Sequence, residues 1–192
     1  MVANPRPRGA ARRDALLDAV LRVVADVGAD AVTHRRVADA AGLPLASTTY
    51  WFESKDEMLT AALQRAADRD TERLDAFLGK TAADPLALAV GALLDPIGQE
   101  RHSARGRLLA TYTLMLEAAR RPELRGVMLR WTDAYHDALS PLLAAAGSSD
   151  PRSDAELLVA AADGLLVAQL ASDDTSDLGP RLRRLADALV SA

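Results

Sequence analysis

The chain has 192 residues, of which 49% are hydrophobic and 26% charged, and it contains no cysteine. This length fits one domain, or one domain with a small appendage, and it is sufficient to bury a sizeable core. The lack of cysteine excludes disulfides, thiolate metal sites and cysteine nucleophiles. The chain has 40 Ala and 31 Leu against 12 Val and 1 Ile, which favours helices and argues against a β-sandwich or a parallel sheet.

The net charge of −4 is distributed unevenly along the chain. Residues 1–36 contain seven Arg and four Asp, a local charge of +3, so the remainder carries −7. A basic end on an acidic body predicts one local anionic partner. No stretch of about 18 apolar residues lacks charges, and the basic N-terminus has no apolar run. We therefore expect a cytoplasmic protein with no membrane partner.

A flexible basic arm and three short helices are predicted first along the chain. The arm covers residues 1–9, which hold two Pro, two Arg and a Gly. A helix is predicted over 11–27, and its apolar face consists of Leu16, Leu17, Val20, Val24 and Val27. Thr33 is a good N-cap for a second helix, and Gly42-Leu43-Pro44 is a tight break before a third helix at about 45–51.

Six longer helices are predicted after this segment. The fourth helix opens on a capping box formed by Ser54 and Glu57 and extends to Gly79. Pro141 is expected to kink or interrupt the seventh helix. The remaining helices are predicted from Asp84 to Gly98, over about 104–119, from Pro122 to Gly147, from Asp150 and, after a polar loop, from about Gly179. The expected fold is all-α with nine helices.

The helix–break–helix unit at about 33–52 is the segment most suggestive of function. A Gly-containing break of this length sets two helices at a steep angle, so that the second can enter the major groove of DNA. Hydroxyl and cationic groups suited to phosphate surround it: Thr33, His34, Arg35, Ser47, Thr48, Thr49, Tyr50 and Lys55. The break alone is weak evidence, because it also occurs in helical proteins that bind no DNA.

Two patterns in this region resemble the signature of tetracycline-repressor-type (TetR family) regulators. They are Thr33-x-x-x-Val37-Ala38-x-x-Ala41-Gly42-Leu43 and Tyr50-x-Phe52-x-Ser54-Lys55-x-x-Met58-Leu59. The resemblance covers Leu16 to Leu59, and Ala162-Asp163-Gly164-Leu165 is similar to a weaker family trait. Two departures are Thr48-Thr49, where the family usually has Leu and an aromatic residue, and Ala46, where Gly is common. Because of these departures the operator sequence cannot be taken from relatives.

The resemblance implies a ligand-responsive transcriptional regulator, most often a repressor. It implies a helix-turn-helix DNA-binding head at 10–56 and an effector-binding and dimerisation body at 57–192, with no cofactor. A homodimer would bind a palindromic operator in double-stranded DNA and be released by a small effector. Lys55, Thr33 and Ser47 match phosphate-contacting positions, and Arg35 matches a base-reading position. The expected DNA-binding residues are Thr33, His34, Arg35, Leu45, Ala46, Ser47, Thr49, Tyr50, Trp51 and Lys55.

Several of these residues, and others in the chain, also have an alternative interpretation. Tyr50 and Trp51 are compatible with core positions, and Lys55 with a solvated surface. The arginines of the arm would form a solvated tail or enter a minor groove of DNA. In the body, aromatic and Met residues at helical spacing are compatible with ordinary core or with the wall of a pocket for a small apolar or amphipathic effector. The expected ligand-binding residues are Tyr112, Met115, Met128, Trp131, Tyr135 and, as a polar anchor, Gln169.

The last two helices carry apolar residues that would form either the monomer's own core or a four-helix bundle between two copies. The expected dimer residues are Leu157, Ala161, Leu165, Leu182, Leu185 and Leu189. We expect no metal site, since His102 and His136 lack carboxylate partners at ligand spacing. A helical interaction module without DNA binding is the alternative function. An all-helical enzyme is disfavoured, because no Ser-His-Asp or Glu-x-x-His spacing is present.

Overall fold

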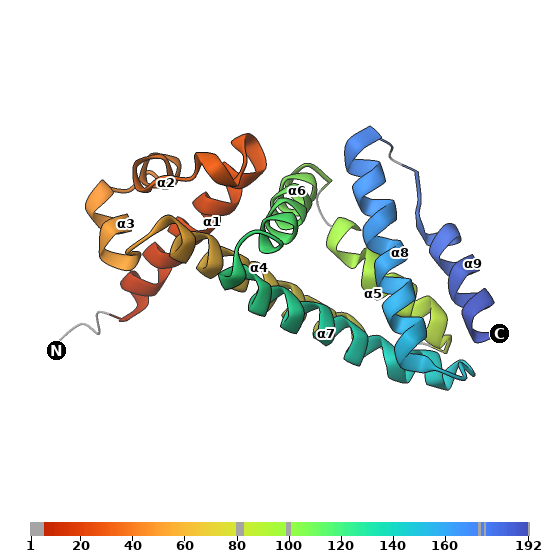
Figure 1. Cartoon of the computed structure of the whole chain (residues 1–192). Helices are drawn as coiled ribbons and strands as arrows, with labels where there is room; N and C mark the ends of the chain where they lie inside the picture. Colours follow the sequence, from red (N-terminus) through yellow and green to blue (C-terminus); the bar gives the residue numbers. More distant parts are fainter. Residues whose placement is uncertain (1–5, 80–82, 99–100, 173, 175, 192) are drawn as a thin grey trace. The chain divides into compact units, whose positions relative to one another are not determined.

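The computed structural model describes residues 6–79, 83–98, 101–172, 174 and 176–191. Over these ranges the chain forms nine α-helices and one short 3-10 helix, η1, and no strand (Figure 1). The prediction of an all-α, nine-helix fold is confirmed. The chain divides into two compact units, Met1–Ala67 with Gly106–Met128 and Asp68–Arg105 with Leu129–Ala192. The first unit is thus larger than the expected head at 10–56.

The first unit begins with α1 (Arg6–Val27), η1 (Ala29–Ala31), α2 (His34–Ala41) and α3 (Leu45–Trp51). Since α1 begins at Arg6, the part of the expected flexible arm from Arg6 to Gly9 is helical instead. Pro7 is compatible with this start, because proline is tolerated in the first turn, where N–H groups have no helical acceptor. Residues 1–5 of that arm lie outside the described residues.

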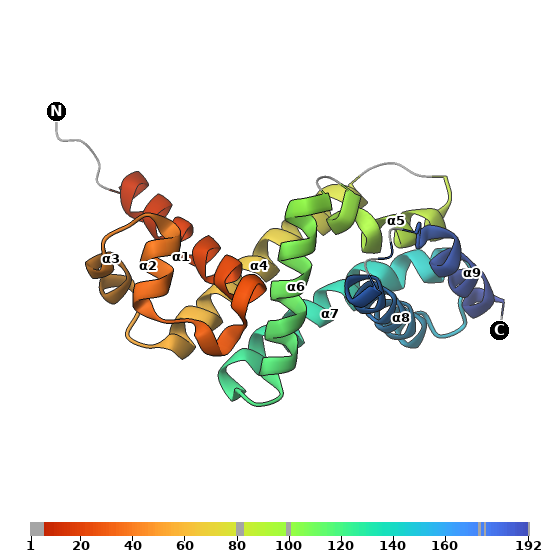
Figure 2. The same ribbon diagram turned by 90° about the horizontal axis from the view of Figure 1, so that it is seen from above.

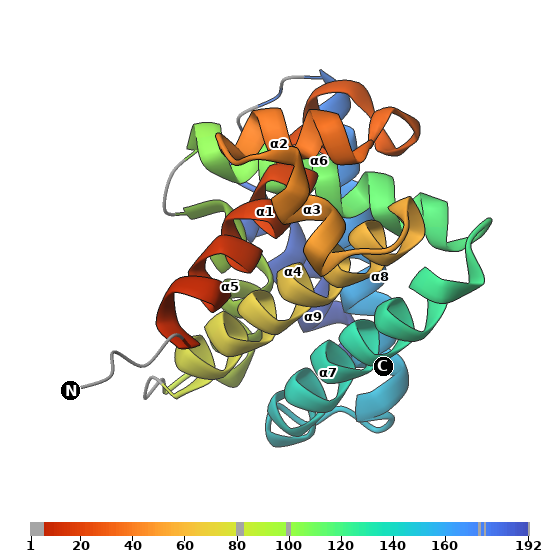
Figure 3. The same ribbon diagram turned by 90° about the vertical axis from the view of Figure 1, so that its left-hand side faces the viewer.

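Local sequence explains the helix–break–helix unit, which Figure 3 shows from the side of α2 and α3. The Thr33 hydroxyl accepts a hydrogen bond from the Arg36 N–H at 3.2 Å and so caps α2. Gly42 ends α2 in the left-handed conformation with φ 64°, and the Leu43 N–H donates to the Ala38 carbonyl at 3.0 Å. Pro44 then precedes α3.

The predicted capping box opens α4 (Lys55–Leu78). The Glu57 N–H donates to the Ser54 hydroxyl at 3.1 Å. The Glu57 carboxylate accepts from the N–H of Glu53 at 2.6 Å, one residue earlier than the usual capping box would have it. Two hydrogen bonds, one to the Ser54 hydroxyl and one to the Glu57 carboxylate, therefore hold the first turn of α4, which carries Lys55.

Side chains from α1, α2 and α4, together with Thr48 of α3 and Phe52 directly after α3, form the core around the helix–break–helix unit. Leu16, Leu17, Val20 and Val24 are buried as predicted, whereas Val27, at the end of the same face, is 57% exposed. The other large buried side chains here include Val37, Phe52, Met58, Leu59 and Leu63. This packing leaves the outer sides of α2 and α3 to solvent.

The second unit contains α5 (Pro85–Gly98), α8 (Pro151–Ser172) and α9 (Gly179–Val190), together with parts of α4, α6 (Arg101–Ala118) and α7 (Pro122–Ala145). The last helix, α9, packs on α5 and α8 (Figure 2). Its Leu182 is completely buried. We expected Leu182 at a dimer interface, but it lies in the core of its own chain. Pro141 does not interrupt α7, which continues to Ala145.

Among the described residues, α8 is the one helix that is long and apolar enough to span a membrane by length and composition alone. Core and interface helices of soluble proteins share this property. Asp163 lies near the middle of α8, where a charged side chain is costly in a bilayer.

Candidate functional site

The helix α3 has one buried side and one exposed side. Thr48 is fully buried, and its hydroxyl donates to the Leu45 carbonyl at 2.8 Å. On the opposite side Tyr50 is 78% exposed and Ala46 is also exposed, and Leu45, at 49%, and Thr49 are exposed between the two sides. Thr48, one of the departures from the family pattern, therefore anchors the helix, and its neighbours are presented to solvent.

Three consecutive aromatic residues at the end of α3 have different environments. Phe52 is 2% exposed and belongs to the core. Trp51 is half-buried beside α1, where a Cβ added to Gly9 would lie 3.8 Å from its ring. Tyr50 meets Trp51 edge to face, with ring centroids 5.1 Å apart. Of the three, Tyr50 is the ring that is accessible to a partner.

The start of α2 adds cationic and hydroxyl groups to the same unit. Thr33 and Arg35 are exposed, while His34 is half-buried with its Nδ1 atom unbonded. Ser47, from α3, is half-buried as well. The Arg36 guanidinium donates to the Ala31 carbonyl at 3.0 Å and thereby holds the turn before α2. The expected DNA-binding residues thus all lie on α2, on α3 or at a helix start of the first unit.

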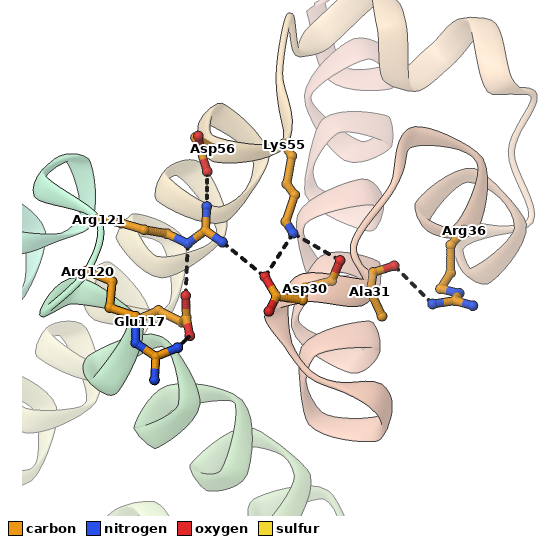
Figure 4. Close-up of polar contacts among 8 residues, drawn as sticks. All are labelled: Asp30, Ala31, Arg36, Lys55, Asp56, Glu117, Arg120 and Arg121. Carbon is orange, nitrogen blue, oxygen red and sulfur yellow. Dashed lines mark hydrogen bonds and ion pairs between the residues drawn. The ribbon is translucent and has the colours of Figure 1, made fainter.

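Lys55 lies at the start of α4 and contacts η1 (Figure 4). Its Nζ donates to the Asp30 carbonyl oxygen at 2.9 Å and lies 3.4 Å from the Asp30 carboxylate. The Lys55 side chain is 30% exposed. Because an ammonium group has three N–H donors, these two contacts leave one donor for a further acceptor.

Arg121, in the turn between α6 and α7, bonds three carboxylates of the first unit (Figure 4). Its Nη2 lies 3.2 Å from Asp30, its Nε donates to Glu117 at 2.9 Å, and its Nη1 pairs with Asp56. The hydrogen bond to Glu117 is the main reason that the pKa of Arg121 is raised. Sequence reasoning missed this cluster, because no periodic pattern connects Asp30 with Arg121.

In the second unit, a buried carboxylate gathers two of the expected ligand-binding residues. Asp70 of α4 is 6% exposed and pairs with Arg73. It accepts hydrogen bonds from Trp131 Nε1 at 3.1 Å and from the Tyr135 hydroxyl at 2.6 Å. Burial, and then Asp70, raise the pKa of Tyr135 above its usual value. The sequence did not single out Asp70, which lies in the charged run Asp68-Arg69-Asp70.

The other expected ligand-binding residues are distributed over both units. Tyr112, Met115 and Met128 are half-buried members of the first unit. Gln169 donates from its side-chain amide to the Ser176 carbonyl at 2.5 Å and so ties the end of α8 to the following segment. Over the part of the chain that the structure describes, no three His, Asp or Glu side chains are placed to hold a metal ion.

One face of α8 is apolar and exposed. Leu157 is 53% exposed, and Ala160, Gly164 and Ala168 follow it at helical spacing as exposed small residues. Ala161 and Leu165 are half-buried beside this row, as are Leu185 and Leu189 of α9. With Leu182 excluded, five of the six expected dimer residues retain exposed surface.

Comparison with known proteins matches both parts of the chain to regulator families. Residues 16–62 match the family model described as "Bacterial regulatory proteins, tetR family". Residues 80–192 match the model described as "Tetracyclin repressor-like, C-terminal domain". The two matches together cover the head and most of the remaining chain.

Individual relatives are similar over most of their length. The chain is 31% identical over 159 residues to the HTH-type transcriptional regulator BetI of Rhizobium meliloti, covering 82% of this chain and 77% of BetI. It is 26% identical to the HTH-type nicotine-responsive transcriptional repressor HdnoR of Paenarthrobacter nicotinovorans, over 94% and 93% of the two chains. The crystal structure of the multidrug binding protein EbrR complexed with ethidium superposes with a TM-score of 0.71 at 32% identity, over 93% of this chain and 98% of EbrR.

Proposed function

Because the chain belongs to the tetracycline-repressor family and is a ligand-responsive, DNA-binding transcriptional regulator, we propose that it represses transcription by binding a palindromic operator as a homodimer. The observation that carries this proposal is the exposed side of α3, opposite the buried Thr48. HdnoR, whose name describes a repressor, supports repression as the outcome. We propose that the protein acts in the cytoplasm and without catalysis; regulators of this family are generally not enzymes.

The proposed contacts with DNA divide into two kinds. We assign base contacts to the exposed side of α3, with Tyr50 and Thr49, and to Arg35, because the major groove admits one helix and its side chains. We assign phosphate contacts to Thr33, whose hydroxyl lies at the start of α2, and to Lys55. Phosphate contacts fix the position on the duplex, and base contacts select the sequence.

We propose that the apolar face of α8, with α9, joins two copies in a four-helix bundle. Its small residues Ala160, Gly164 and Ala168 allow two helices to approach closely, and Leu157 supplies apolar area to bury. A two-fold dimer presents two heads, which accounts for a palindromic operator with two half-sites.

We propose that the effector binds at the cluster of Asp70, Trp131 and Tyr135 in the second unit. Two aromatic rings and a carboxylate suit a small amphipathic molecule, since ligand sites are mostly apolar with few polar anchors. The nicotine-responsive HdnoR and the EbrR–ethidium complex support such an effector. The effector must bind the released form more tightly than the DNA-bound form, because only differential affinity shifts the population.

Selection from a pool of randomised duplexes tests the DNA-binding proposal. We expect a palindromic sequence to be enriched, and Arg35→Ala or Thr49→Ala to change the preferred bases at about 1–3 kcal/mol per lost contact. Lys55→Ala should weaken binding to all duplexes alike and lower the salt slope by about one. If no sequence were enriched from the pool, the operator proposal would be contradicted. If Lys55→Ala changed the preferred base sequence, the phosphate role of Lys55 would be contradicted.

Titration with ethidium tests the effector site separately. We expect ethidium to raise the melting temperature of the protein, because a ligand at about 100 times its dissociation constant adds roughly 2.7 kcal/mol. The shift should be lost in Trp131→Ala and retained in Trp51→Ala, which alters the other tryptophan of the chain. Equal loss in both variants, or retention in Trp131→Ala, would place the ligand elsewhere.

A further inference from the structure

We propose that Arg121 is a positioning residue for DNA binding, which acts on Lys55 through the carboxylate of Asp30. By pairing with Asp30, Arg121 weakens the hold of this carboxylate on the Lys55 ammonium and so keeps that ammonium available to a phosphate. The inference rests on the proposed phosphate role of Lys55. It gives the turn between α6 and α7, far from the helix-turn-helix in sequence, an indirect effect on the affinity for DNA.

The geometry around Asp30 shows one carboxylate shared between two cations (Figure 4). The same oxygen, Oδ1, lies 3.4 Å from Lys55 Nζ and 3.2 Å from Arg121 Nη2. The Asp30 side chain is 87% exposed, so it is no buried anchor of the fold. The Asp30 backbone carbonyl, at 2.9 Å, holds Lys55 in place independently of the carboxylate. The carboxylate can therefore compete with a phosphate for the Lys55 ammonium without being needed to position it.

Without Arg121, the charge of Asp30 would act on Lys55 alone. A carboxylate this close to the ammonium competes with a phosphate for the same N–H donors, and its negative charge repels the DNA backbone. Arg121 supplies a second positive charge that the carboxylate shares. The Asp30 carboxylate therefore interacts partly with Arg121, outside the helix-turn-helix, and less strongly with the ammonium of Lys55.

Arg121 is oriented by partners other than Asp30. Its Nε bonds Glu117, in the last turn of α6, and its Nη1 pairs with Asp56 in the first turn of α4. The Arg121 side chain is 21% exposed, against 80% for its neighbour Arg120, whose contact among the residues of Figure 4 is Glu117 at 3.6 Å. Arg120 is therefore a matched control, because it carries the same charge on the same turn without reaching Asp30.

Fluorescence anisotropy with a labelled duplex recovered by selection tests the proposal on the full-length protein. At about 50 mM salt we expect Arg121→Ala to weaken binding about two- to fivefold, the range of an exposed ion pair, and Arg120→Ala to have a smaller effect. Asp30→Asn should tighten binding by a similar factor. In the Asp30→Asn background, Arg121→Ala should cost no more than Arg120→Ala does. All these differences should shrink at about 200 mM salt, where exposed charges are screened.

The decisive result is the double variant. If Asp30→Asn with Arg121→Ala binds as weakly as Arg121→Ala alone, Arg121 acts only by holding the structure, and the proposal is wrong. Asp30→Asn keeps the backbone contact to Lys55 and should fold normally, so its failure to tighten binding would also overturn the proposal, even if Arg121→Ala were unstable. Lys55→Ala on the same duplex tests the phosphate role of Lys55 separately from the role of Arg121. If this variant binds normally, the phosphate role of Lys55 is wrong. If Lys55→Ala weakens binding while the Asp30 and Arg121 variants do not change it, only the present inference fails.

Discussion

Replacing Asp70 with alanine should destabilise the second unit substantially. In the native structure the Asp70 carboxylate accepts from Trp131 Nε1 and from the Tyr135 hydroxyl, and the alanine variant leaves both donors without their acceptor. An unsatisfied buried donor costs about 1–3 kcal/mol, and we take the lower half of this range because both rings are half-buried. The ion pair with Arg73 adds at most about 1 kcal/mol, because the arginine is 40% exposed. The two donors together cost about 2–4 kcal/mol, so with the ion pair the expected loss in the free energy of unfolding is about 2–5 kcal/mol.

Tyr135→Phe is the graded control for this prediction. It removes one donor and leaves Asp70 with Trp131 and Arg73, so we expect a loss of about 1 kcal/mol. Urea denaturation followed by tryptophan fluorescence measures both variants, with comparable m-values and one protein concentration for all samples. A cost for Asp70→Ala no larger than that for Tyr135→Phe would refute the reasoning, because the carboxylate would then not satisfy two donors.

Further predictions concern the core, the pH dependence and the dimer. Phe52→Ala should cost about 3–5 kcal/mol in thermal denaturation and abolish DNA binding. Tyr50→Ala should change stability by less than about 0.5 kcal/mol, because this side chain is exposed, yet should weaken DNA binding; unchanged anisotropy would contradict the assigned contact. Burial raises the pKa of Tyr135, so folding favours its neutral form, and the free energy of unfolding of the wild type should fall as the pH rises above about 10. Tyr135→Phe lacks this ionisable group, so the difference in the free energy of unfolding between the wild type and this variant should shrink above that pH. Leu157→Glu should give monomers in sedimentation, whereas the control Leu116→Glu, at a side chain 75% exposed on α6, should remain dimeric.

The elements that could be predicted from the sequence depend on residues close together along the chain. The cap of α2 joins Thr33 to Arg36, and the capping box of α4 joins Ser54 to Glu57. Such contacts span three residues, so residue type and spacing specify them. The start of α1 at Arg6 differs from the prediction, because two prolines in residues 1–9 indicate an irregular arm, although a proline in the first turn is compatible with a helix.

The contacts behind the proposed role of Arg121 and the proposed effector site join residues that are far apart along the chain. Asp30 and Arg121 are 91 residues apart, and Asp70 and Tyr135 are 65 apart. Charged residues at helix starts and turns are common, and nothing in their local pattern distinguishes a paired side chain from a solvated one. The sequence therefore predicted Lys55 as a phosphate ligand but could not show that Asp30 competes for it.

Leu157 and Leu182 show that helical spacing alone does not distinguish a core leucine from one at the proposed dimer interface. Both are leucines at helical spacing in the last two helices, and the sequence pattern placed both at one interface. In the folded chain α9 turns Leu182 towards its core, whereas Leu157 remains 53% exposed. Burial within the chain already accounts for the apolar character of Leu182, whereas the exposed Leu157 in the row on α8 is accounted for by a partner. The proposed interface is therefore centred on α8, and substitutions on its exposed row should affect assembly before they affect folding.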